Sequence, residues 1–304
     1  MKKTIRGFIG LVCMVLLLIS FTGCDFLWED DGEPEITISD KLYFSSNRDG
    51  DYEIYVLNGD GFLEQLTDNT NYSDWMSDYS AATGKIAFYS NRGGNNDIWV
   101  MDADGSNPTQ LTSTLLIENY PSFSPDGSKI VYMRDHEIWV MGSDGSNQDE
   151  LLFTTDDMSD PEWSPVGNRI AISRNEWDNN EIYAFDIAGD NSVSSIDNLT
   201  NSQGHESYPD WSPDGSKIAY SADSEIWVMD ADGGNKVQLT DNSVYDHKPV
   251  WSPDGTKIFY VTQVNGKYEI FVMDLDGSNK TNVTNSPDTN ETDPVVVENH
   301  ELVG

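Results

Sequence analysis

The chain has 304 residues, of which 37% are apolar and 11% aromatic, enough for one large domain or two smaller ones with a substantial core. Its 53 acidic and 17 basic side chains give a formal net charge of −36. Such a surface repels phosphate backbones and anionic lipid headgroups, which excludes nucleic acid as a partner. It favours divalent cations or a basic protein surface, unless the charge serves only solubility.

The first 23 residues have the layout of a lipoprotein signal peptide. A basic head, MKKTIR, precedes an apolar run that is too short and wrongly flanked for a stable spanning helix. The stretch FTGC, residues 21–24, resembles a bacterial lipobox, so we expect a lipidated Cys24 followed by an acidic tether over residues 24–40. An uncleaved N-terminal anchor is the alternative. The lipidated and the uncleaved form both predict a domain that is held at a membrane outside the cytoplasm. In a Gram-negative bacterium this domain would lie in the periplasm.

Cys13 and Cys24 are the only cysteines of the chain. If Cys13 leaves with the signal peptide and Cys24 carries lipid, no thiol remains in the folded part. The sequence therefore predicts neither disulfides nor thiolate chemistry there.

One apolar segment recurs along the rest of the chain. Its copies include EIWVMDADG and begin at Tyr52, Asn96, His136, Asn180, Ser224 and Tyr268, in steps of 44, 40, 44, 44 and 44 residues. A fixed period of 40–45 residues is typical of propeller blades, each of which is one four-stranded sheet. The six copies therefore predict an all-β fold, a six-bladed β-propeller of four-stranded antiparallel blades.

Each repeat divides into four short strands, here named A to D. Strand A contains the PxWSP-like segments at residues 121, 161, 209 and 249, and an Asp-Gly hairpin leads to strand B, such as KIAYSA. Strand C is the EIWVM segment, and strand D is VQLT or a relative of it. Strand C is apolar on both faces, as expected for a blade sandwiched between two neighbours.

The two ends of the repeat region predict how the ring closes. The first repeat begins at residue 41 without a PxWSP segment, whereas the orphan segment 294–298, DPVVVE from its preceding Asp293, stands after the last repeat. We expect residues 294–298 to supply the innermost strand of the first blade and so to remove an open sheet edge. The propeller then spans residues 41–298, with 299–304 as a tail. Residues 35–39, EITIS, are the alternative for the same place.

The repeat PDWSPDGSKIAY, followed by EIWVMDADGGNKVQLT, resembles the propeller repeat of TolB-like proteins, a WD40-like or PD40-type repeat. It is also similar to the N-terminal propellers of prolyl oligopeptidase-type enzymes. The resemblance covers residues 41–298 and implies the fold, whereas function depends on sites grafted onto it.

The Asp-Gly turns look at first like calcium loops. An EF-hand needs oxygen ligands at positions 1, 3 and 5, glycine at 6 and a bidentate Glu at 12, which MDADGSN at 101–107 does not provide. Because Asp-Gly readily adopts the positive φ angles of tight hairpins, we expect Asp126, Asp214 and Asp254 to accept bonds from nearby backbone amides.

Enzyme signatures are scarce. The sequence contains no G-x-S-x-G, H-E-x-x-H, Walker or G-x-G-x-x-G motif, and its four histidines, 136, 205, 247 and 300, stand singly. Related oligogalacturonate lyases hold a metal with several histidines, and His205 and His247 both precede a strand A. A metal-assisted polysaccharide lyase or hydrolase using these two residues and nearby carboxylates is therefore an alternative, although we expect no metal and no cofactor.

The connections from strand D to the next strand A carry the candidate binding residues. They are expected to surround the channel mouth with carboxylates and aromatic rings: Tyr72, Asp74, Glu118, Tyr120, Asp160, Glu206, Tyr208, Asp246, His247, Glu291 and Asp293. Such a ring suits a basic protein or peptide, and the TolB resemblance implies a lipoprotein partner at a channel mouth. We therefore predict a monomeric, non-catalytic scaffold that binds an envelope protein. A carbohydrate-binding module and merely solvated loops are the alternatives.

Overall fold

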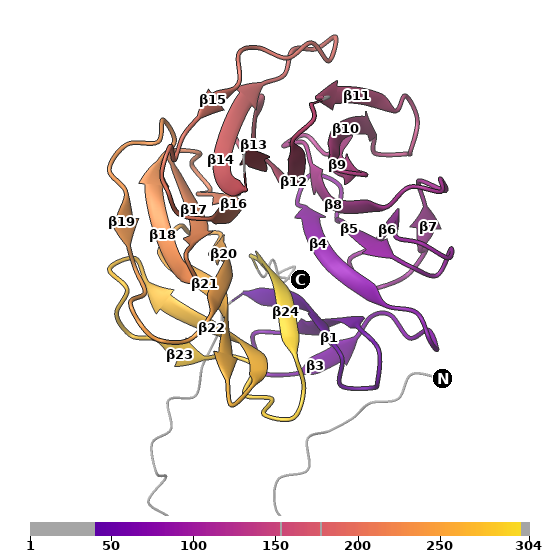
Figure 1. Ribbon diagram of the computed structural model, residues 1–304. Coiled ribbons are helices and arrows are strands. Elements are labelled where there is room, and N and C mark those ends of the chain that lie inside the picture. Colours follow the sequence, from indigo (N-terminus) through magenta and orange to yellow (C-terminus); the bar gives the residue numbers. More distant parts are fainter. Residues whose placement is uncertain (1–39, 153, 177, 299–304) are drawn as a thin grey trace, which may run out of the picture. The chain divides into compact units, whose positions relative to one another are not determined.

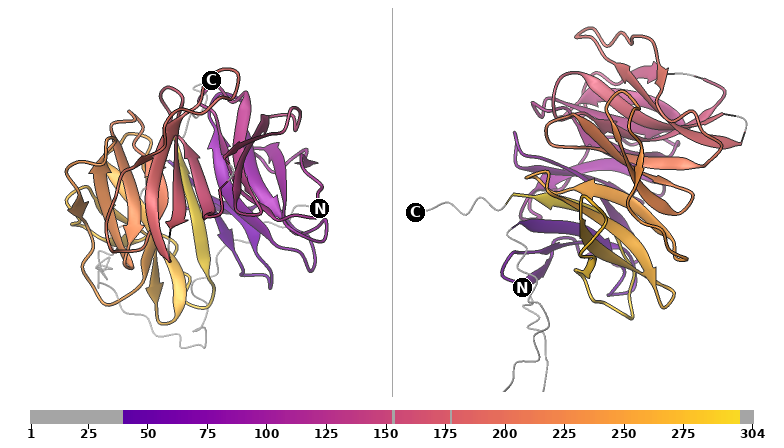
Figure 2. Two further views of the ribbon diagram at one scale, coloured as in Figure 1. Left: turned by 45° about the horizontal axis from the view of Figure 1, so that its top comes forward. Right: turned by 90° about the vertical axis from the view of Figure 1, so that its left-hand side faces the viewer.

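The computed structural model describes residues 40–152, 154–176 and 178–298. Within them, 24 strands form six four-stranded antiparallel sheets, arranged around an axis as blades (Figure 1). The predicted six-bladed β-propeller is thereby confirmed. Figure 2 shows the blades from the side, with their strands running between the two faces of the ring.

Each blade is a meander that runs outwards from the axis. In the order A to D, blade 1 consists of β24 (Glu291–Val297), β1 (Lys41–Ser46), β2 (Glu53–Leu57) and β3 (Leu63–Gln65), and blade 2 of β4 (Asp74–Ser80), β5 (Lys85–Ser90), β6 (Asp97–Asp102) and β7 (Thr109–Gln110). Blade 3 consists of β8 (Glu118–Phe123), β9 (Lys129–Arg134), β10 (Glu137–Gly142) and β11 (Asp149–Leu152), and blade 4 of β12 (Asp157–Trp163), β13 (Arg169–Glu176), β14 (Asn179–Asp186) and β15 (Asp197–Asn198). Blade 5 consists of β16 (Glu206–Trp211), β17 (Lys217–Ala222), β18 (Glu225–Asp230) and β19 (Val237–Gln238), and blade 6 of β20 (Asp246–Trp251), β21 (Lys257–Val264), β22 (Lys267–Asp274) and β23 (Thr281–Asn282). The loop face carries the B–C and D–A connections, and the turn face carries the A–B and C–D turns.

The core lies between blades rather than within them. Ile54 and Val56 of strand β2 pack in one cluster with Ile86 and Phe88 of blade 2. Tyr55, between them in sequence, packs instead with residues of blade 6. Strand C therefore buries both of its faces, because successive side chains point to opposite sides of the sheet. No blade could bury these faces alone.

The C-terminal strand closes the ring, as predicted. β24 pairs antiparallel with β1, from Lys41 opposite Val297 to Ser46 opposite Glu291, and so completes blade 1 on its inner side. β24 spans Glu291–Val297, so it begins three residues before the predicted segment 294–298 and ends one residue before the end of that segment. Residues 35–39 lie outside the described part of the chain.

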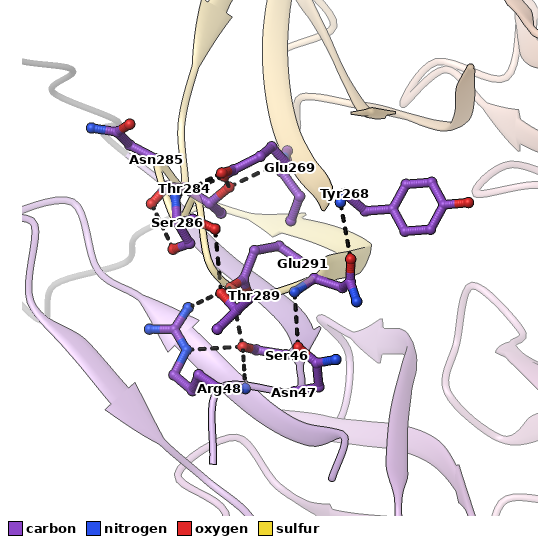
Figure 3. Close-up of polar contacts among 12 residues, drawn as sticks. Ser46, Asn47, Arg48, Tyr268, Glu269, Thr284, Asn285, Ser286, Thr289 and Glu291 are labelled. Carbon is purple, nitrogen blue, oxygen red and sulfur yellow. Dashed lines mark hydrogen bonds and ion pairs between the residues drawn. The ribbon is translucent and has the colours of Figure 1, made fainter. Parts of the chain in front are cut away.

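Polar contacts fasten this closing strand (Figure 3). Arg48 donates from Nη2 to Glu291 Oε1 at 3.0 Å, and the Ser46 hydroxyl donates to the same oxygen at 3.1 Å. The Asn290 amide donates to Asn47 Oδ1 at 2.8 Å. Glu291 is fully buried. A charge-assisted hydrogen-bond network around the buried Glu291 carboxylate thus joins β24 to β1 and to the β1–β2 connection.

The Asp-Gly turns are structural, as the sequence predicted. Asp126 Oδ1 accepts from the Ser128 amide at 3.0 Å and from the Ser124 hydroxyl at 2.7 Å, while Gly127 adopts a φ of 67°. These bonds lower the pKa of Asp126 to about 2, since they stabilise the charged carboxylate. Asp214 and Asp254 accept the equivalent amide bonds. The aspartates shape the hairpins.

The expected signal peptide, Cys24, the tether up to residue 39 and the tail 299–304 lie outside the described residues. Within those residues, no helix is long and apolar enough to cross a membrane.

Removal of the closing strand tests the ring. We expect deletion of residues 290–304 to lower the melting temperature by more than about 10 °C or to abolish cooperative unfolding, because it bares β1 and the inner faces of two blades. Thermal circular dichroism measures this. A control that lacks only residues 299–304 retains β24, and equal melting curves for the two truncations would contradict closure by β24.

Candidate functional site

The structure moves most of the predicted binding residues from loops into strands. Tyr72 lies on a D–A connection, but the other ten lie in strands A, namely Asp74, Glu118, Tyr120, Asp160, Glu206, Tyr208, Asp246, His247, Glu291 and Asp293. Their placement on connecting loops was wrong, because each strand A begins several residues before its PxWSP-like segment. A bulge just before the proline keeps the strand paired, as the register shift between Asn119 and Ser122 shows.

The predicted residues at the start of the strands A, nearest the loop face and called here the first level, belong to the framework. Asp74, Glu118, Glu206, Asp246 and Glu291 are at most 3% exposed. In blade 3, Arg134 Nε donates to Glu118 Oε1 at 2.9 Å and its guanidinium lies 4.1 Å from the Trp139 ring centroid. Arg92 pairs with Asp74 through Nη2, while its Nε donates to the Ser90 hydroxyl. These carboxylates hold strands together and do not face a partner.

Two blades lack this arginine. Glu206 lies opposite Ala222 in strand register, whereas Glu118 lies opposite Arg134. Burial raises the pKa of Glu206 to about 7, and the neighbouring Glu181 carboxylate adds to the shift. Glu206 Oε2 is buried without a hydrogen-bond partner. In blade 6, Thr262 stands opposite Asp246 instead.

The residues at the bulges of the strands A, called here the second level, line the channel. Tyr120, Asp160, Tyr208, Lys248 and Asp293 all adopt φ angles between 49° and 55°, and each precedes a proline. Lys248 Nζ pairs with Asp293 Oδ1 and lies 5.3 Å from the Tyr208 ring centroid. Lys248 was not among the predicted residues, although its position before Pro249 is equivalent to those of Tyr120 and Asp160 before their prolines.

A third level was missed altogether. Asp78, Glu162 and Asp210, called here the acidic trio, come from the strands A of blades 2, 4 and 5 and line one channel cavity of about 600 Å³. Strand alternation could have predicted two of these acids. Glu162 and Asp210 stand two residues after Asp160 and Tyr208, so their side chains project to the same side of the strand.

The acidic trio is electrostatically strained. Burial raises the pKa of Asp78 to about 6 and that of Asp210 to about 7. Burial, together with the charges of Asp78 and Asp210, also raises the pKa of Glu162 well above its usual range. Backbone amides of Phe123 and Tyr79 donate to Asp78 at 2.6 Å each.

The channel cavity extends toward the turn face. Its lining runs from the second level, through the acidic trio, to Pro125, Pro165, Pro213 and Pro253 of the A–B turns. Among the described residues that line it, Lys248 is the only basic one. Of the residues predicted for the channel mouth, Tyr120, Asp160, Tyr208 and Asp293 line this cavity, whereas Asp78, Glu162 and Asp210 were not predicted.

The two candidate metal-binding histidines lie in different environments. His247 is 7% exposed and enclosed by aromatic rings, with centroids 4.4 Å away for Tyr245 and 5.2 Å for Tyr268. Burial, with Lys248 nearby, lowers its pKa to about 3. His205 is exposed. Across residues 40–152, 154–176 and 178–298, only Asp49, Asp51 and Glu53 bring three possible ligand atoms within 4.8 Å.

Exposed apolar side chains gather on the loop face. Leu115 is 98% exposed, and its neighbours Leu116 and Ile117 are 42% and 48% exposed, all on the connection from β7 to β8. Tyr72, and the pair Val244 and Tyr245, occupy two further D–A connections and are also at least 40% exposed. Leu115, Leu116 and Ile117 are consecutive in the chain and are called here the apolar patch of the loop face.

Comparison with known proteins decides the family. A family profile described as the TolB β-propeller domain, PD40, matches residues 134–303, which is more than half of the chain. The chain belongs to this family. No curated protein matches the sequence.

Solved structures agree on the fold. TolB from Acinetobacter baumannii superposes with a TM-score of 0.73 at 20% identity, over 86% of this chain and 67% of that one. A putative TolB from Agrobacterium tumefaciens gives 0.61 at 19%, over 80% and 88%. An oligogalacturonate lyase in complex with manganese gives 0.57 at 14%, over 81% and 74%. At these identities the likeness concerns the propeller alone.

The missing arginine of blade 5 yields a stability prediction. The raised pKa of Glu206 means that the folded state keeps a proton that the unfolded state has lost, so stability falls as pH rises from about 4.3 toward 7. Ala222→Arg supplies the guanidinium and favours the charged form. We expect the free energy of unfolding at pH 8 to rise by about 1–3 kcal/mol, with little gain at pH 4.

Urea denaturation at the two pH values measures this gain. Ala82→Arg, at an exposed residue, is the matched control for the change in net charge. A gain of the same size in both variants, or one that does not depend on pH, would contradict the assignment.

The acidic trio yields a second stability prediction. Glu162→Gln removes a carboxylate whose charged form the channel disfavours. We expect a higher melting temperature at pH 8 and a smaller difference at pH 5, where the protonated acid resembles glutamine. Differential scanning calorimetry with Glu150→Gln, an exposed residue of β11, as the control tests this. Destabilisation by Glu162→Gln would show that the carboxylate serves the framework.

Proposed function

We propose that this chain is a non-catalytic propeller of the cell envelope, anchored through a lipidated Cys24, that binds a basic protein or peptide through its loop face. The observation that carries the proposal is the apolar patch. An exposed apolar patch rimmed by polar residues is typical of a protein-binding surface. Leu115 at 98% exposure has no packing role within the described fold.

Charge on the same face favours a basic partner. Arg48, Arg92 and Arg134 near this face are engaged by buried carboxylates, and their side chains are only 8–23% exposed. Exposed carboxylates meanwhile stand on the B–C and D–A connections: Asp68, Asp135, Asp178, Asp223, Asp241 and Asp288. A face that exposes both apolar and acidic side chains would recognise a partner with apolar and basic side chains, since complementary charge gives specificity and speeds association.

The N-terminal sequence and the family support the location. The basic head, apolar run and FTGC stretch before the propeller fit export and lipidation. Similar solved propellers carry the name TolB. Of the predicted contacts, Tyr72 stays in the proposal, whereas the five buried first-level acids are reassigned to the framework.

The alternatives have weaker support. A metal-assisted lyase would need His205 and His247 to reach one ion, but aromatic rings enclose His247. A carbohydrate-binding module would need exposed stacking platforms, for which Tyr72 and Tyr245 are the candidates on the described loop face.

Site-specific photocrosslinking in envelopes tests the proposal. A crosslinker at position 115 is expected to capture one defined protein, while a crosslinker at Leu275 on the turn face does not. In binding assays with that purified protein, Leu115→Ser, Leu116→Ser and Ile117→Ser together are expected to weaken affinity at least about tenfold, because the three side chains bury apolar area.

The control for these binding assays removes exposed apolar residues from the turn face. Phe62→Ser with Leu275→Ser should leave affinity unchanged, since both residues lie on C–D turns. Equal effects of the two sets of substitutions, or affinity that is insensitive to salt, would contradict a basic partner on the loop face.

A further inference from the structure

The channel cavity holds far more acid than base. Asp78, Glu162 and Asp210 come from three blades, and Asp160 and Asp293 line the same cavity one level nearer the loop face, whereas Lys248 is the only basic residue lining the cavity within the described chain. Lys248 is already paired with Asp293. A concave site of about 600 Å³ with a few convergent polar groups is the usual form of a small-ligand site.

A second, independent observation points to a ligand with hydrogen-bond donors. Asp293 is part of the cavity wall, and its side chain is 91% buried. Its Oδ1 atom pairs with Lys248, but its Oδ2 atom has no hydrogen-bond partner. A buried carboxylate oxygen without a donor is costly. A cationic donor bound in the cavity would relieve that cost.

The spacing of the acidic trio favours an organic cation over a bare metal ion. A calcium ion takes its oxygen ligands at about 2.3–2.6 Å, which requires them to converge tightly. Across the described residues, only the separate Asp49, Asp51 and Glu53 group brings three candidate ligand atoms within 4.8 Å. A guanidinium group is planar and presents five N–H donors on three sides, so it can bridge carboxylates that are farther apart.

The wall of the cavity is rigid. Trp163, Trp211 and Trp251 line it but are only 5–7% exposed, because their rings pack into the clusters between blades. A guanidinium group is weakly hydrated compared with an ammonium group, which lowers the cost of moving it into such a cavity. The backbone amide of Trp251 donates to Asp210 Oδ2 at 2.7 Å and thereby fixes that carboxylate.

We propose that the channel cavity, entered from the turn face, binds a guanidinium group through Asp78, Glu162 and Asp210. The group is either the side chain of an arginine within a protein segment or a free small molecule such as arginine. This site lies at the opposite end of the molecule from the apolar patch, so it does not depend on the proposed loop-face partner.

Isothermal titration calorimetry of the propeller at low salt and pH 8 tests the site. The probes are Nα-acetyl-L-arginine amide, free L-arginine, Nα-acetyl-L-lysine amide and calcium chloride. We expect a dissociation constant on the order of 1 mM or lower for the arginine amide. Glu162→Gln should weaken it at least about tenfold, whereas the matched Glu150→Gln should not, because only Glu162 is within the cavity.

The outcomes separate the alternatives. Tighter binding of the amide than of free arginine supports an arginine side chain in a protein segment, and the reverse supports a free metabolite. Absence of binding by both arginine probes, equal binding of the lysine amide, or calcium binding that Glu162→Gln abolishes would each overturn the proposal. The Leu115, Leu116 and Ile117 serine variant should bind arginine amide normally, which keeps this test separate from that of the loop face. Calorimetric unfolding confirms that each variant is folded.

Discussion

The structure depends on one constraint: a four-stranded blade cannot bury its own two faces. Ile54 and Tyr55 are neighbours in sequence, yet they pack into cores shared with blade 2 and blade 6. Burial is therefore complete only when every blade has two neighbours, which requires a closed ring. The pairing of β24 with β1 and the buried Glu291 contacts follow from this requirement, because the chain ends must meet in one sheet.

Closure also determines where charge goes. Strands A surround the axis, so any acid on their inner side is surrounded by protein on all sides. At the edges of the blades, arginines such as Arg134 compensate buried acids such as Glu118. Along the axis, one lysine stands among several carboxylates. Among the buried acids of the described residues, Asp74, Glu118 and Glu291 are paired with arginine, whereas the channel stays acidic. Uncompensated buried charge is a stability cost that is common where a protein binds a ligand.

The sequence predicted the fold well because its signal is repeated six times. Strand alternation, Asp-Gly turns and the orphan segment with Pro294 each specify local geometry without long-range information. The site was predicted less well. The bulges that turn Tyr120 and Asp160 toward the axis depend on strand pairing, and the facing of Asp78, Glu162 and Asp210 depends on how three distant blades meet. Single repeats contain neither. The burial of Glu118 and Glu206 likewise became evident only once their strand partners, Arg134 and Ala222, were known.

The two proposals assign a protein partner to the apolar and acidic loop face and a cation to the acidic channel. The central claim is that Asp78, Glu162 and Asp210 lack a compensating cation in the free protein. Carbon-13 NMR of labelled Asp and Glu side-chain carboxyls across a pH titration tests it most directly. The account predicts that Asp78 titrates near pH 6, Asp210 near pH 7 and Glu162 above the usual glutamate range. Titration of all three near the ordinary value of about 4 would contradict it.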